Sequence, residues 1–554
     1  MAKPVKLKRN EIPEGFSHTD FKYKGRAAKD QDDFDLEVGI ADMACVDQFG
    51  SSNTNKYYHA GVVEANGKWF IYLEWGRIFS GASWEGGYHN GQDFQFAESE
   101  SEEEARAFFE KQCRDKNIKR LEEKEIGGET IWVSKGKNSA YLVQSLSTRE
   151  KGLPDAANIK DSTGIIKESK KKASKKTAKG PKTTYQPEVI SLAQSLVSGV
   201  QTYTKAAIAA TGVSPTMAAI DKVRNTLIPL AGQRIAAVGN DIEDQLNDKE
   251  LIEISTLAAT IVPRQIPRGG SVRSRQESIL LSANNILSIQ QDLDTFEASL
   301  QNENFEETQN DDGFSPHQAL VGEGEVTWIN PDSVKGRFII SGFTNMSNNR
   351  HSYMQGKLKI LNVFEINRPD RDSKFIEYAK KIAEKNKNIK YETFARLQPK
   401  NRIDISDISD IVPGANIALG LHGTRIVNVQ PILTSNLKLP KSLPSSVKVT
   451  GRAFGNATYL SCDWKKSYGY VGHCGSYYNN VGSTKNSSFM MFFCNFVMGD
   501  SFNTTTTGNW STPPNNKDSI AAYPEFMRTL VNNEHMLFHE DAQQIKYLIE
   551  ADLV

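Results

Sequence analysis

The residues able to do chemistry lie in four short segments in the second half of this 554-residue chain. They supply an imidazole, phenols, a hydroxyl and a carboxylate: His422, Tyr459, Ser467, Tyr470 and Glu534. Such groups can hydrogen-bond a substrate and stabilise the charge that develops on it. Each is a weak signal alone, because a single histidine is more often a satisfied polar residue, a strand tyrosine usually packs and a strand glutamate usually faces solvent. They have to be judged as a set.

Other chemistries have little support in the sequence. The five cysteines contain no C-x-x-C pair, which argues against a zinc site and a disulfide framework and favours a reducing compartment. Gly61–Lys68 departs from a phosphate-binding loop, because its spacing is one residue too long and no Ser or Thr follows the lysine. No G-x-G-x-x-G segment opens a helix after a strand, so a dehydrogenase-type dinucleotide fold is not expected.

Strands are predicted in the second half of the chain, after an acidic stretch at Glu303–Asp312. The clearest patterns are Lys357–Ile366, Asn416–Leu421 and Phe489–Met498. The last is almost continuously apolar, which is typical of a strand buried on both faces at the centre of a sheet. Asn533–Ile549 shows a final strand-and-helix pattern.

A series of amphipathic helices precedes these strands. Pro187 lies near the first turn of one helix, and Ser214-Pro215 opens the next. The apolar residues at helical spacing are Val189, Leu192, Ala193, Leu196, Val197 and Val200; then Ile235, Val238, Ile242 and Leu246; then Leu251, Ile254, Leu257, Ala258 and Ile261; then Ile286, Ile289, Leu293, Phe296 and Leu300. Several such helices in a row predict a helical bundle.

The N-terminal part predicts a small α+β module that ends near Thr148. Asn66-Gly67 separates two strand-like runs, Lys56–Glu64 and Lys68–Arg77, and is a strong signal for a tight hairpin turn. Ser101 can cap a helix that follows. One stripe of that helix is apolar: Ala105, Phe108, Phe109 and Cys113.

Thr163–Pro187 is predicted to be a flexible basic linker between this module and the helices. Within it, Lys170–Lys182 carries seven lysines and no acid, in a chain whose formal net charge is zero. This run can contact nucleic-acid phosphates, act as a nuclear import signal or be a solvated linker, and the sequence leaves all three open. No apolar run approaches the ~20 residues of a membrane helix, and Met1–Asn10 is basic, so we expect a soluble protein without an export signal.

Several of these segments resemble motifs of the poly(ADP-ribose) polymerase family. Tyr72-Leu73-Glu74-Trp75-Gly76-Arg77, with the later Phe109-Glu110-Lys111 and Arg114-Asp115-Lys116, looks like a WGR domain. The family's histidine segment is similar to Leu421–Arg425 with Asn428. Its tyrosine segment is similar to Gly451–Tyr459 with Lys466-Ser467 and Tyr470. Its glutamate segment is similar to Asn533-Glu534 with Gln543 and Tyr547-Leu548. Ile254–Pro263 is similar to the end of its regulatory helical domain. The resemblance runs from about Tyr23 to the C-terminus and is closest to the small DNA-dependent members.

This resemblance implies an α+β multidomain fold: a small α+β WGR module, an all-α helical bundle and a mixed, mostly-β ADP-ribosyltransferase catalytic domain. The expected divisions are a short basic tail at 1–20, the WGR DNA-binding domain at 21–150, the basic linker at 151–186, the regulatory helical domain at 187–315 and the catalytic domain at 316–554.

The implied substrate is NAD, and no metal takes part. NAD loses nicotinamide from its ribose through an oxocarbenium-like state. By resemblance, His422 would hydrogen-bond the adenosine ribose, Tyr459 would flank the nicotinamide ring, and Glu534 would stabilise the ribosyl cation. The other implied NAD contacts are Gly423, Thr424, Asn428, Gly455, Ser467 and Tyr470: Gly423 and Ser467 would hold the carboxamide, and Tyr470 would stack on the ring.

The resemblance also implies control by DNA. Trp75 would stack at a strand end and Arg77 would pair with phosphate. For Trp75 the alternative is core packing, since it shares a strand face with Trp69, Ile71 and Leu73. The helical domain would cover the NAD cleft until DNA engagement loosens it.

The departures from the family pattern bear on elongation and acceptor choice more than on NAD cleavage. Asn456-Ala457 stands where relatives often have Lys-Gly, and Arg452 and Ala453 occupy acceptor-side positions. We expect DNA-break-stimulated transfer of ADP-ribose to proteins, extending to poly(ADP-ribose), in the DNA damage response. The alternatives are single-unit transfer to protein or to nucleic-acid ends, and a catalytically silent scaffold that binds DNA ends.

The expected partners are DNA strand breaks and acceptor proteins, the chain itself included. No membrane is expected to take part, and the free protein is expected to be a monomer. The expected location is the nucleus in a eukaryote and the cytoplasm in a prokaryote or a virus-infected cell.

Overall fold

The computed structural model describes residues 5–6, 35–47, 49, 54–65, 68–77, 93–135, 140–147, 185–211, 215–262, 271–302, 315–347, 358–390, 412–439, 453–471 and 488–553. Two compact units divide the chain. Unit 1 comprises residues 1–175 and 205–286, and unit 2 comprises residues 176–204 and 287–554. One division falls inside helix α3 (Pro187–Thr211), and another falls at the first turn of α9 (Ile286–Gln301). No helix among the described residues is long and apolar enough to cross a membrane.

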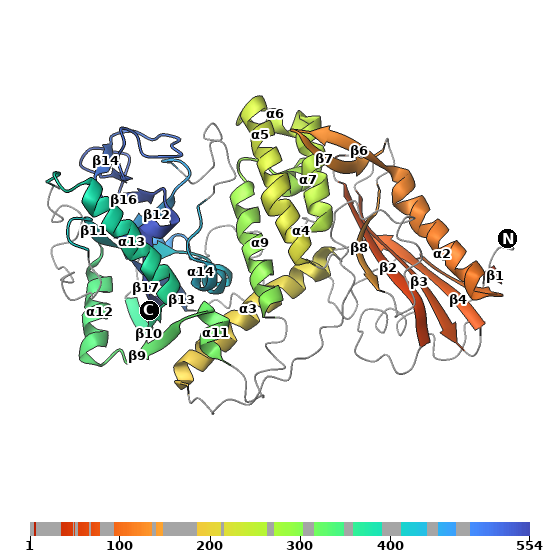
Figure 1. Ribbon diagram of the computed structural model, residues 1–554, viewed down its shortest axis with the longest axis horizontal. Coiled ribbons are helices and arrows are strands. Elements are labelled where there is room, and N and C mark those ends of the chain that lie inside the picture. Colours follow the sequence, from red (N-terminus) through yellow and green to blue (C-terminus); the bar gives the residue numbers. More distant parts are fainter. Residues whose placement is uncertain are drawn as a thin grey trace. The chain divides into compact units, whose positions relative to one another are not determined.

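Unit 1 is built on a six-stranded antiparallel sheet in the order β1-β5-β4-β3-β2-β8 (Figure 1). The strands are β1 (Val5–Lys6), β2 (Asp35–Asp47), β3 (Thr54–Ala65), β4 (Lys68–Arg77), β5 (Asp93–Ser99) and β8 (Leu142–Ser147). Ala65 pairs with Lys68, so the predicted hairpin is confirmed, although Asn66 and Gly67 themselves lie outside the described residues.

Helix α2 (Glu102–Lys116) packs on this sheet. Its N-cap is Ser101, whose side chain accepts a hydrogen bond from the backbone N–H of Glu104 at 3.2 Å, as predicted. The predicted stripe on α2 lies in one core with the predicted face of β4: Ala105, Phe109 and Cys113 are buried there with Ile71 and Leu73, and Phe108, Trp69 and Trp75 are partly buried. The α+β module expected near the N-terminus is therefore present among the described residues.

The rest of unit 1 is a hairpin and a group of helices. The hairpin is β6 (Leu121–Ile126) with β7 (Glu129–Ser134), preceded by η3 (Ile118–Arg120). The helices are α4 (Met217–Lys222), η5 (Val223–Leu227), α5 (Ile228–Val238), α6 (Ile242–Asn247), α7 (Lys249–Ile261) and α8 (Val272–Ile279). Helix α7 contacts the sheet, where the hydroxyl of Thr260 accepts from the backbone N–H of Val46 at 3.3 Å. It also contacts the hairpin, where Lys124 of β6 forms an ion pair with Glu253.

One helix prediction in this region was wrong in detail. The stripe Ile235–Leu246 is not one helix, because Gly239, at φ 106°, ends α5, and Asp241 caps a new helix, α6. Helix α4 begins at Met217 with Thr216 as its N-cap, and Ser214, of the predicted Ser214-Pro215 opening, lies outside the described residues. The predicted stripe on α7 is buried, as is almost all of the stripe on α9.

Unit 2 is built on a nine-stranded sheet in the order β14-β15-β16-β12-β11-β13-β17-β10-β9. All neighbours are antiparallel except β14 and β15, which are parallel. The strands are β9 (Glu325–Ile329), β10 (Leu358–Asn367), β11 (Ile417–Gly423), β12 (Thr458–Ser461), β13 (Phe489–Val497), β14 (Ser501–Thr504), β15 (Ser519–Ala522), β16 (Glu534–Leu537) and β17 (Gln543–Leu553).

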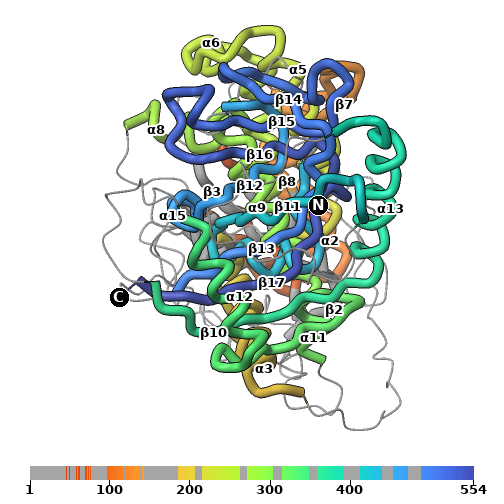
Figure 2. Tube along the Cα trace, turned by 90° about the vertical axis from the view of Figure 1, so that its left-hand side faces the viewer, coloured from red at the N-terminus to blue at the C-terminus, as the bar shows by residue number. Residues whose placement is uncertain are grey.

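Strand β13 is the buried central strand that its apolar run predicts. Every residue from Phe489 to Val497 is buried, and β13 pairs with β11 on one side and β17 on the other (Figure 2). Its alternate residues pack into two cores on opposite faces of the sheet. One core is covered by α12 (Val334–Asn345) and α15 (Trp464–Tyr468), the other by α11 (Pro316–Val321), α14 (Val429–Ser435) and the first part of α3. Helix α13 (Pro369–Lys385) packs around Ile417 and Val497.

The end of the chain differs from the prediction of a strand followed by a helix. After β16 the chain makes only the short η9 (Glu540–Ala542) and then enters the eleven-residue strand β17. Ile545, Leu548 and Ile549 have helical spacing. However, β17 lies between β13 and β10 and is covered on both faces, so apolar residues occur at both odd and even positions along the strand. Periodicity alone cannot distinguish such a strand from a helix.

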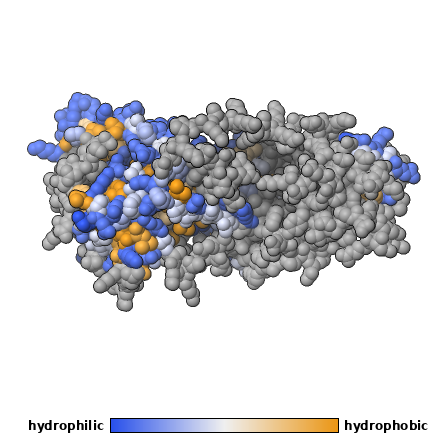
Figure 3. All heavy atoms as spheres, turned by 90° about the horizontal axis from the view of Figure 1, so that it is seen from below, coloured by the Kyte–Doolittle hydropathy of each residue, from blue (hydrophilic) through white to orange (hydrophobic). Residues whose placement is uncertain are grey.

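On the face seen in Figure 3, the coloured part of the surface mixes hydrophilic residues with apolar ones. Among the described residues, the large apolar side chain with the greatest exposure is Val334 on α12, at 80 %. Single apolar residues on a surface are ordinary and need no partner to explain them.

Candidate active site

His422 lies near the end of β11 and is partly buried. Its Nδ1 is 3.1 Å from the backbone carbonyl oxygen of Tyr459 on β12. Because a carbonyl oxygen can only accept, Nδ1 carries the hydrogen, and Nε2 is the acceptor nitrogen of the neutral ring. The fold therefore fixes both the orientation and the tautomer of His422.

Gly423 and Ser467 are in direct contact. A Cβ atom on Gly423 would lie 1.9 Å from the carbonyl oxygen of Ser467, so only glycine fits at this position. The hydroxyl of Ser467, 3 % exposed, donates to the carbonyl of Leu421 at 3.3 Å. Ser467 belongs to α15, whose N-cap is Asp463. The backbone at the end of β11 is thus in direct contact with the backbone of helix α15.

Thr424 and Asn428 stabilise the turn that follows β11. Both are buried, and the Asn428 amide donates to the Thr424 hydroxyl at 3.2 Å. Asn428 ends the 3₁₀ turn η8 (Ile426–Asn428), from which α14 continues. The two side chains shape the segment behind His422.

Tyr459 closes the loop that leads into β12. Its hydroxyl donates to the carbonyl of Gly455 at 2.9 Å and accepts from the N–H of Phe454 at 3.0 Å. Gly455 has φ 93°, and a Cβ there would lie 2.0 Å from the carbonyl oxygen of Trp510. Glycine is therefore required at 455 both by its conformation and by the close approach of Trp510.

Glu534 begins β16, next to β12. It pairs in register with Ser461 of β12 and with Ala522 of β15. Its carboxylate forms an ion pair with the ammonium group of Lys466, in α15. The side chains of Lys466 and Glu534 are 20 % and 13 % exposed, so the pair is only partly screened by solvent.

Tyr470 lies just beyond α15 and is 58 % exposed. Its backbone N–H donates to the carbonyl of Ser467 at 3.0 Å, which keeps it close to that residue. A large exposed aromatic ring beside buried polar groups is suited to stacking on a flat ligand.

The structure thus brings the predicted residues of the catalytic region together. His422 contacts Tyr459, β12 joins Tyr459 to Glu534, and α15 links Glu534 to Gly423 through Lys466 and Ser467. This set offers a carboxylate, a fixed imidazole, a hydroxyl and backbone groups around one region of the sheet. Among the described residues, no group of three or more His, Cys, Asp or Glu could hold a metal ion.

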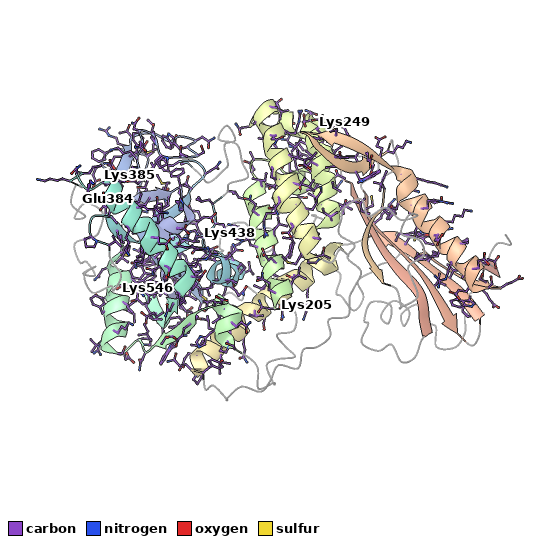
Figure 4. All side chains as sticks on the ribbon, in the orientation of Figure 1. Lys205, Lys249, Glu384, Lys385, Lys438 and Lys546 are labelled. Carbon is purple, nitrogen blue, oxygen red and sulfur yellow. The ribbon has the colours of Figure 1, made fainter. Side chains whose placement is uncertain are left out.

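Helix α9 contacts the turn behind His422. Arg425 lies 3.4 Å from Asp292 and donates to the amide oxygen of Gln291 at 3.2 Å. Asp292 is 8 % exposed and also accepts a 2.7 Å hydrogen bond from Tyr203 of α3. A second ion pair, at 3.0 Å, joins Asp294 to Lys438, which Figure 4 labels. Residues of α3 and α9 are therefore tied to the segment that carries the candidate NAD contacts.

Arg368 is a further supporting residue that the sequence analysis did not find. It is fully buried, and its guanidinium group donates to the carbonyl of Leu433 at 2.9 Å and to the side chain of Asn436 at 2.8 Å. These contacts cap the C-terminal end of α14. Burial lowers the pKa of Arg368 to about 10, so its charge persists at neutral pH.

The two predicted DNA contacts lie in unit 1. Trp75 is partly buried, and its ring stacks on that of Tyr58 with centroids 6.2 Å apart. Core packing thus accounts for part of its surface. The backbone of Arg77 pairs with Lys56, and the side chain of Arg77 lies outside the described residues.

One comparison with known proteins finds a match in this part of the chain. The family model of the poly(ADP-ribose) polymerase catalytic domain matches residues 339–543, a range that contains His422, Tyr459 and Glu534. Domains of this kind transfer ADP-ribose from NAD, and the large mixed sheet of the C-terminal region fits such a domain. No curated protein matches the chain.

Proposed function

We propose that this protein transfers ADP-ribose from NAD to acceptor proteins, itself included, with release of nicotinamide, and that DNA breaks stimulate the transfer. The observation that supports the catalytic part best is the arrangement of His422, Tyr459 and Glu534 on β11, β12 and β16, three neighbouring strands inside the matched region. Loss of NAD turnover on replacement of Glu534, with the fold intact, is the result this proposal requires.

The site residues fit the demands of this reaction. Bound NAD supplies an ADP-ribosyl group whose bond to nicotinamide breaks through an oxocarbenium-like transition state. Glu534 provides negative charge for that state, and Lys466 holds its carboxylate in one orientation. Nε2 of His422 can accept a hydrogen bond from a ribose hydroxyl, because Nδ1 is already committed to Tyr459.

Gly423, Ser467 and Tyr470 fit the binding of a flat carboxamide. The backbones of Gly423 and Ser467 lie together, the hydroxyl of Ser467 is bonded to the carbonyl of Leu421, and exposed Tyr470 is three residues further on. Hydrogen bonds to the carboxamide and stacking on the ring would fix the leaving group relative to Glu534.

The contacts of α9 support regulation by the helices. Asp292 restrains Arg425, and Asp294 restrains Lys438, so movement of α9 would alter the segments on both sides of α14. We propose that DNA engagement shifts the population towards a state in which α9 is released. The N-terminal module would then recognise DNA, and the part of the chain after residue 316 would transfer ADP-ribose.

One observation favours single-unit transfer as a second candidate. Asn456 occupies the place where related sequences often have lysine, and its side chain is only 8 % exposed, while its backbone N–H is bonded to Trp510 at 2.8 Å. This position therefore offers no exposed cation to an incoming polymer end. Glu534 itself favours elongation, so only product analysis separates the two.

The test is incubation with labelled NAD, with and without nicked or blunt-ended DNA, followed by gel separation. A DNA-dependent smear of high mass supports polymer formation, and discrete labelled bands support single-unit transfer. Label on the DNA instead of protein would redirect the proposal to nucleic-acid ends. Absence of label and of nicotinamide release would refute the transferase and leave a DNA-binding scaffold.

A further inference from the structure

The stretch of chain that joins β14 to β15 contacts the loop that leads into Tyr459. In Figure 2 the strands β14, β15, β16 and β12 follow one another in that order, and β12 carries Tyr459. The N–H of Gly508 donates to the carbonyl of Ala453 at 3.0 Å. The carbonyl of Trp510 accepts from the N–H of Asn456 at 2.8 Å. Two backbone hydrogen bonds thus join this stretch to both ends of the loop.

The indole of Trp510 packs against the same loop. Its ring lies parallel to that of Phe454, at an interplanar angle of 3° with centroids 6.5 Å apart. The ring of Phe502 on β14 meets the indole edge to face at 6.1 Å. A Cβ atom on Gly508 would lie 2.6 Å from the indole, so the ring packs directly on this glycine. These contacts hold the indole in one orientation.

The loop held by Trp510 is also bonded to Tyr459. The hydroxyl of Tyr459 accepts from the N–H of Phe454 at 3.0 Å and donates to the carbonyl of Gly455 at 2.9 Å. The carbonyl of Tyr459 in turn accepts from Nδ1 of His422 at 3.1 Å. A displacement of the turn at Phe454-Gly455 would therefore reach His422 through Tyr459.

Core packing alone accounts poorly for Trp510. The core at this end of the sheet buries Phe454, Ile520 and Met536 completely, whereas Trp510 is only partly buried at its margin. Its closest contacts are with the backbone of the loop, because Gly455 lacks a Cβ that would lie 2.0 Å from the Trp510 carbonyl oxygen. Such an arrangement suits a residue that fixes a loop more than one that fills a core.

We propose that Trp510 is a positioning residue for the nicotinamide end of the NAD site. It acts through the turn at Phe454-Gly455, to which Tyr459 is bonded, and so keeps the phenol of Tyr459 and the imidazole of His422 in one arrangement. This inference rests on the proposed function, because that function places Tyr459 beside the nicotinamide ring.

The experiment measures NAD turnover and its inhibition by nicotinamide in the full chain. For Trp510→Ala we expect KM for NAD to rise about tenfold and nicotinamide to inhibit about tenfold more weakly, with less than about threefold loss of kcat, because Glu534 is unchanged. Trp510→Phe keeps a ring against Phe454 and should recover most of the loss. Gly508→Ala removes no side chain but displaces the indole, so it should reproduce the rise in KM.

Ile520→Val is the matched control. Ile520 is fully buried in the same core, and its shortening should lower the melting temperature without changing KM or the inhibition by nicotinamide. An equal rise in KM in Ile520→Val and Trp510→Ala would overturn the positioning role, because general loosening of the core would then explain both. Unchanged KM and unchanged nicotinamide inhibition in Trp510→Ala and Gly508→Ala would also overturn it.

Hydrogen exchange tests the contact without NAD turnover. The N–H groups of Phe454 and Asn456 are bonded to Tyr459 and Trp510, and in Trp510→Ala both should exchange about tenfold faster, while Ile520→Val leaves them unchanged. Unchanged exchange in Trp510→Ala would overturn the inference while wild-type turnover still supports the transferase. No turnover in the wild type, with faster exchange in Trp510→Ala, would refute the proposed function and leave Trp510 as a residue that only holds a turn.

Discussion

Lys466 and Glu534 form an ion pair although 68 residues separate them in the chain. Lys466 comes directly before Ser467 in α15, and Glu534 begins β16. The pair therefore couples the helix that contacts Gly423 to the strand that carries the carboxylate. A carboxylate meant to face a developing positive charge needs such support, since an unrestrained side chain would sample other rotamers.

Replacement of Glu534 by Gln removes this charge at nearly constant volume. We expect kcat for nicotinamide release to fall about 100- to 1,000-fold with little change in KM, because the charge acts mainly in the transition state. Lys466→Met should lower kcat by about tenfold, since it only positions the carboxylate. Glu525→Gln is the control, because Glu525 is exposed, and this variant should behave as wild type. Equal losses in the Glu525 and Glu534 variants would contradict this role.

Gly423→Ala tests the contact between β11 and α15. The added Cβ would lie 1.9 Å from the carbonyl oxygen of Ser467, so the two backbones must separate. A displacement of about 1 Å can cost about 100-fold in kcat/KM, and we expect a rise in KM for NAD to account for much of it. Gly199→Ala is the control, because no atom would lie within 4 Å of the added Cβ. Unchanged KM in the Gly423 variant would remove this residue from the NAD site.

Local signals in the sequence predicted much of the fold. Ser101 caps α2 because its side chain accepts from the backbone N–H of Glu104, one of the first donors of the helix, and this needs no tertiary context. The run Phe489–Val497 identified a central strand because only a strand covered on both faces buries every residue. The ordered motifs around His422, Tyr459 and Glu534 fall on three neighbouring strands, an adjacency that the sequence did not predict.

The remaining features depend on contacts between distant segments. Strand β17 has apolar residues that also fit a helix, and only its two neighbouring strands decide between them. The ion pairs of Glu534 with Lys466 and of Asp292 with Arg425 join charged residues that are far apart in the sequence. With 24 % charged residues, sequence alone allows many such pairings and favours none.

Asp292→Ala tests the restraint that α9 places on the site. The change removes the partner of Arg425 and the acceptor of the Tyr203 hydroxyl, so both the turn behind His422 and the α3–α9 contact loosen. If the helices inhibit, NAD turnover without DNA should rise about three- to tenfold, which corresponds to about 1 kcal/mol of coupling. Asp294→Asn disrupts a more exposed pair on the same helix and should raise it less. A fall in basal turnover for the Asp292 variant would mean that α9 supports the active site instead of inhibiting it.

His535, the residue after Glu534, predicts how stability depends on pH. It is fully buried between Phe496 and Tyr523, and neither of its ring nitrogens has a hydrogen-bond partner. Burial lowers the pKa of His535 from 6.5 to about 4, so the folded protein keeps the ring neutral. Between pH 6.5 and about pH 4, His535 binds a proton in the unfolded chain but not in the folded chain. The contribution of His535 to the free energy of unfolding is therefore fully present above pH 6.5. It falls as the pH is lowered, by up to about 3 kcal/mol near pH 4.

His535→Phe should remove this dependence and raise the melting temperature at pH 7, because two unsatisfied buried nitrogens are replaced by an apolar ring of similar shape. Thermal melts at pH 7, 6 and 5 measure both effects, with His539→Gln as the control, since His539 is exposed. Carboxylates and other groups also titrate in this range, so the informative quantity is the difference between the two variants at each pH. Parallel curves for the two variants would show that the imidazole of His535 is protonated in the folded protein as readily as in the unfolded chain. Strand β16, which carries Glu534, would then be more open to solvent than its packing indicates.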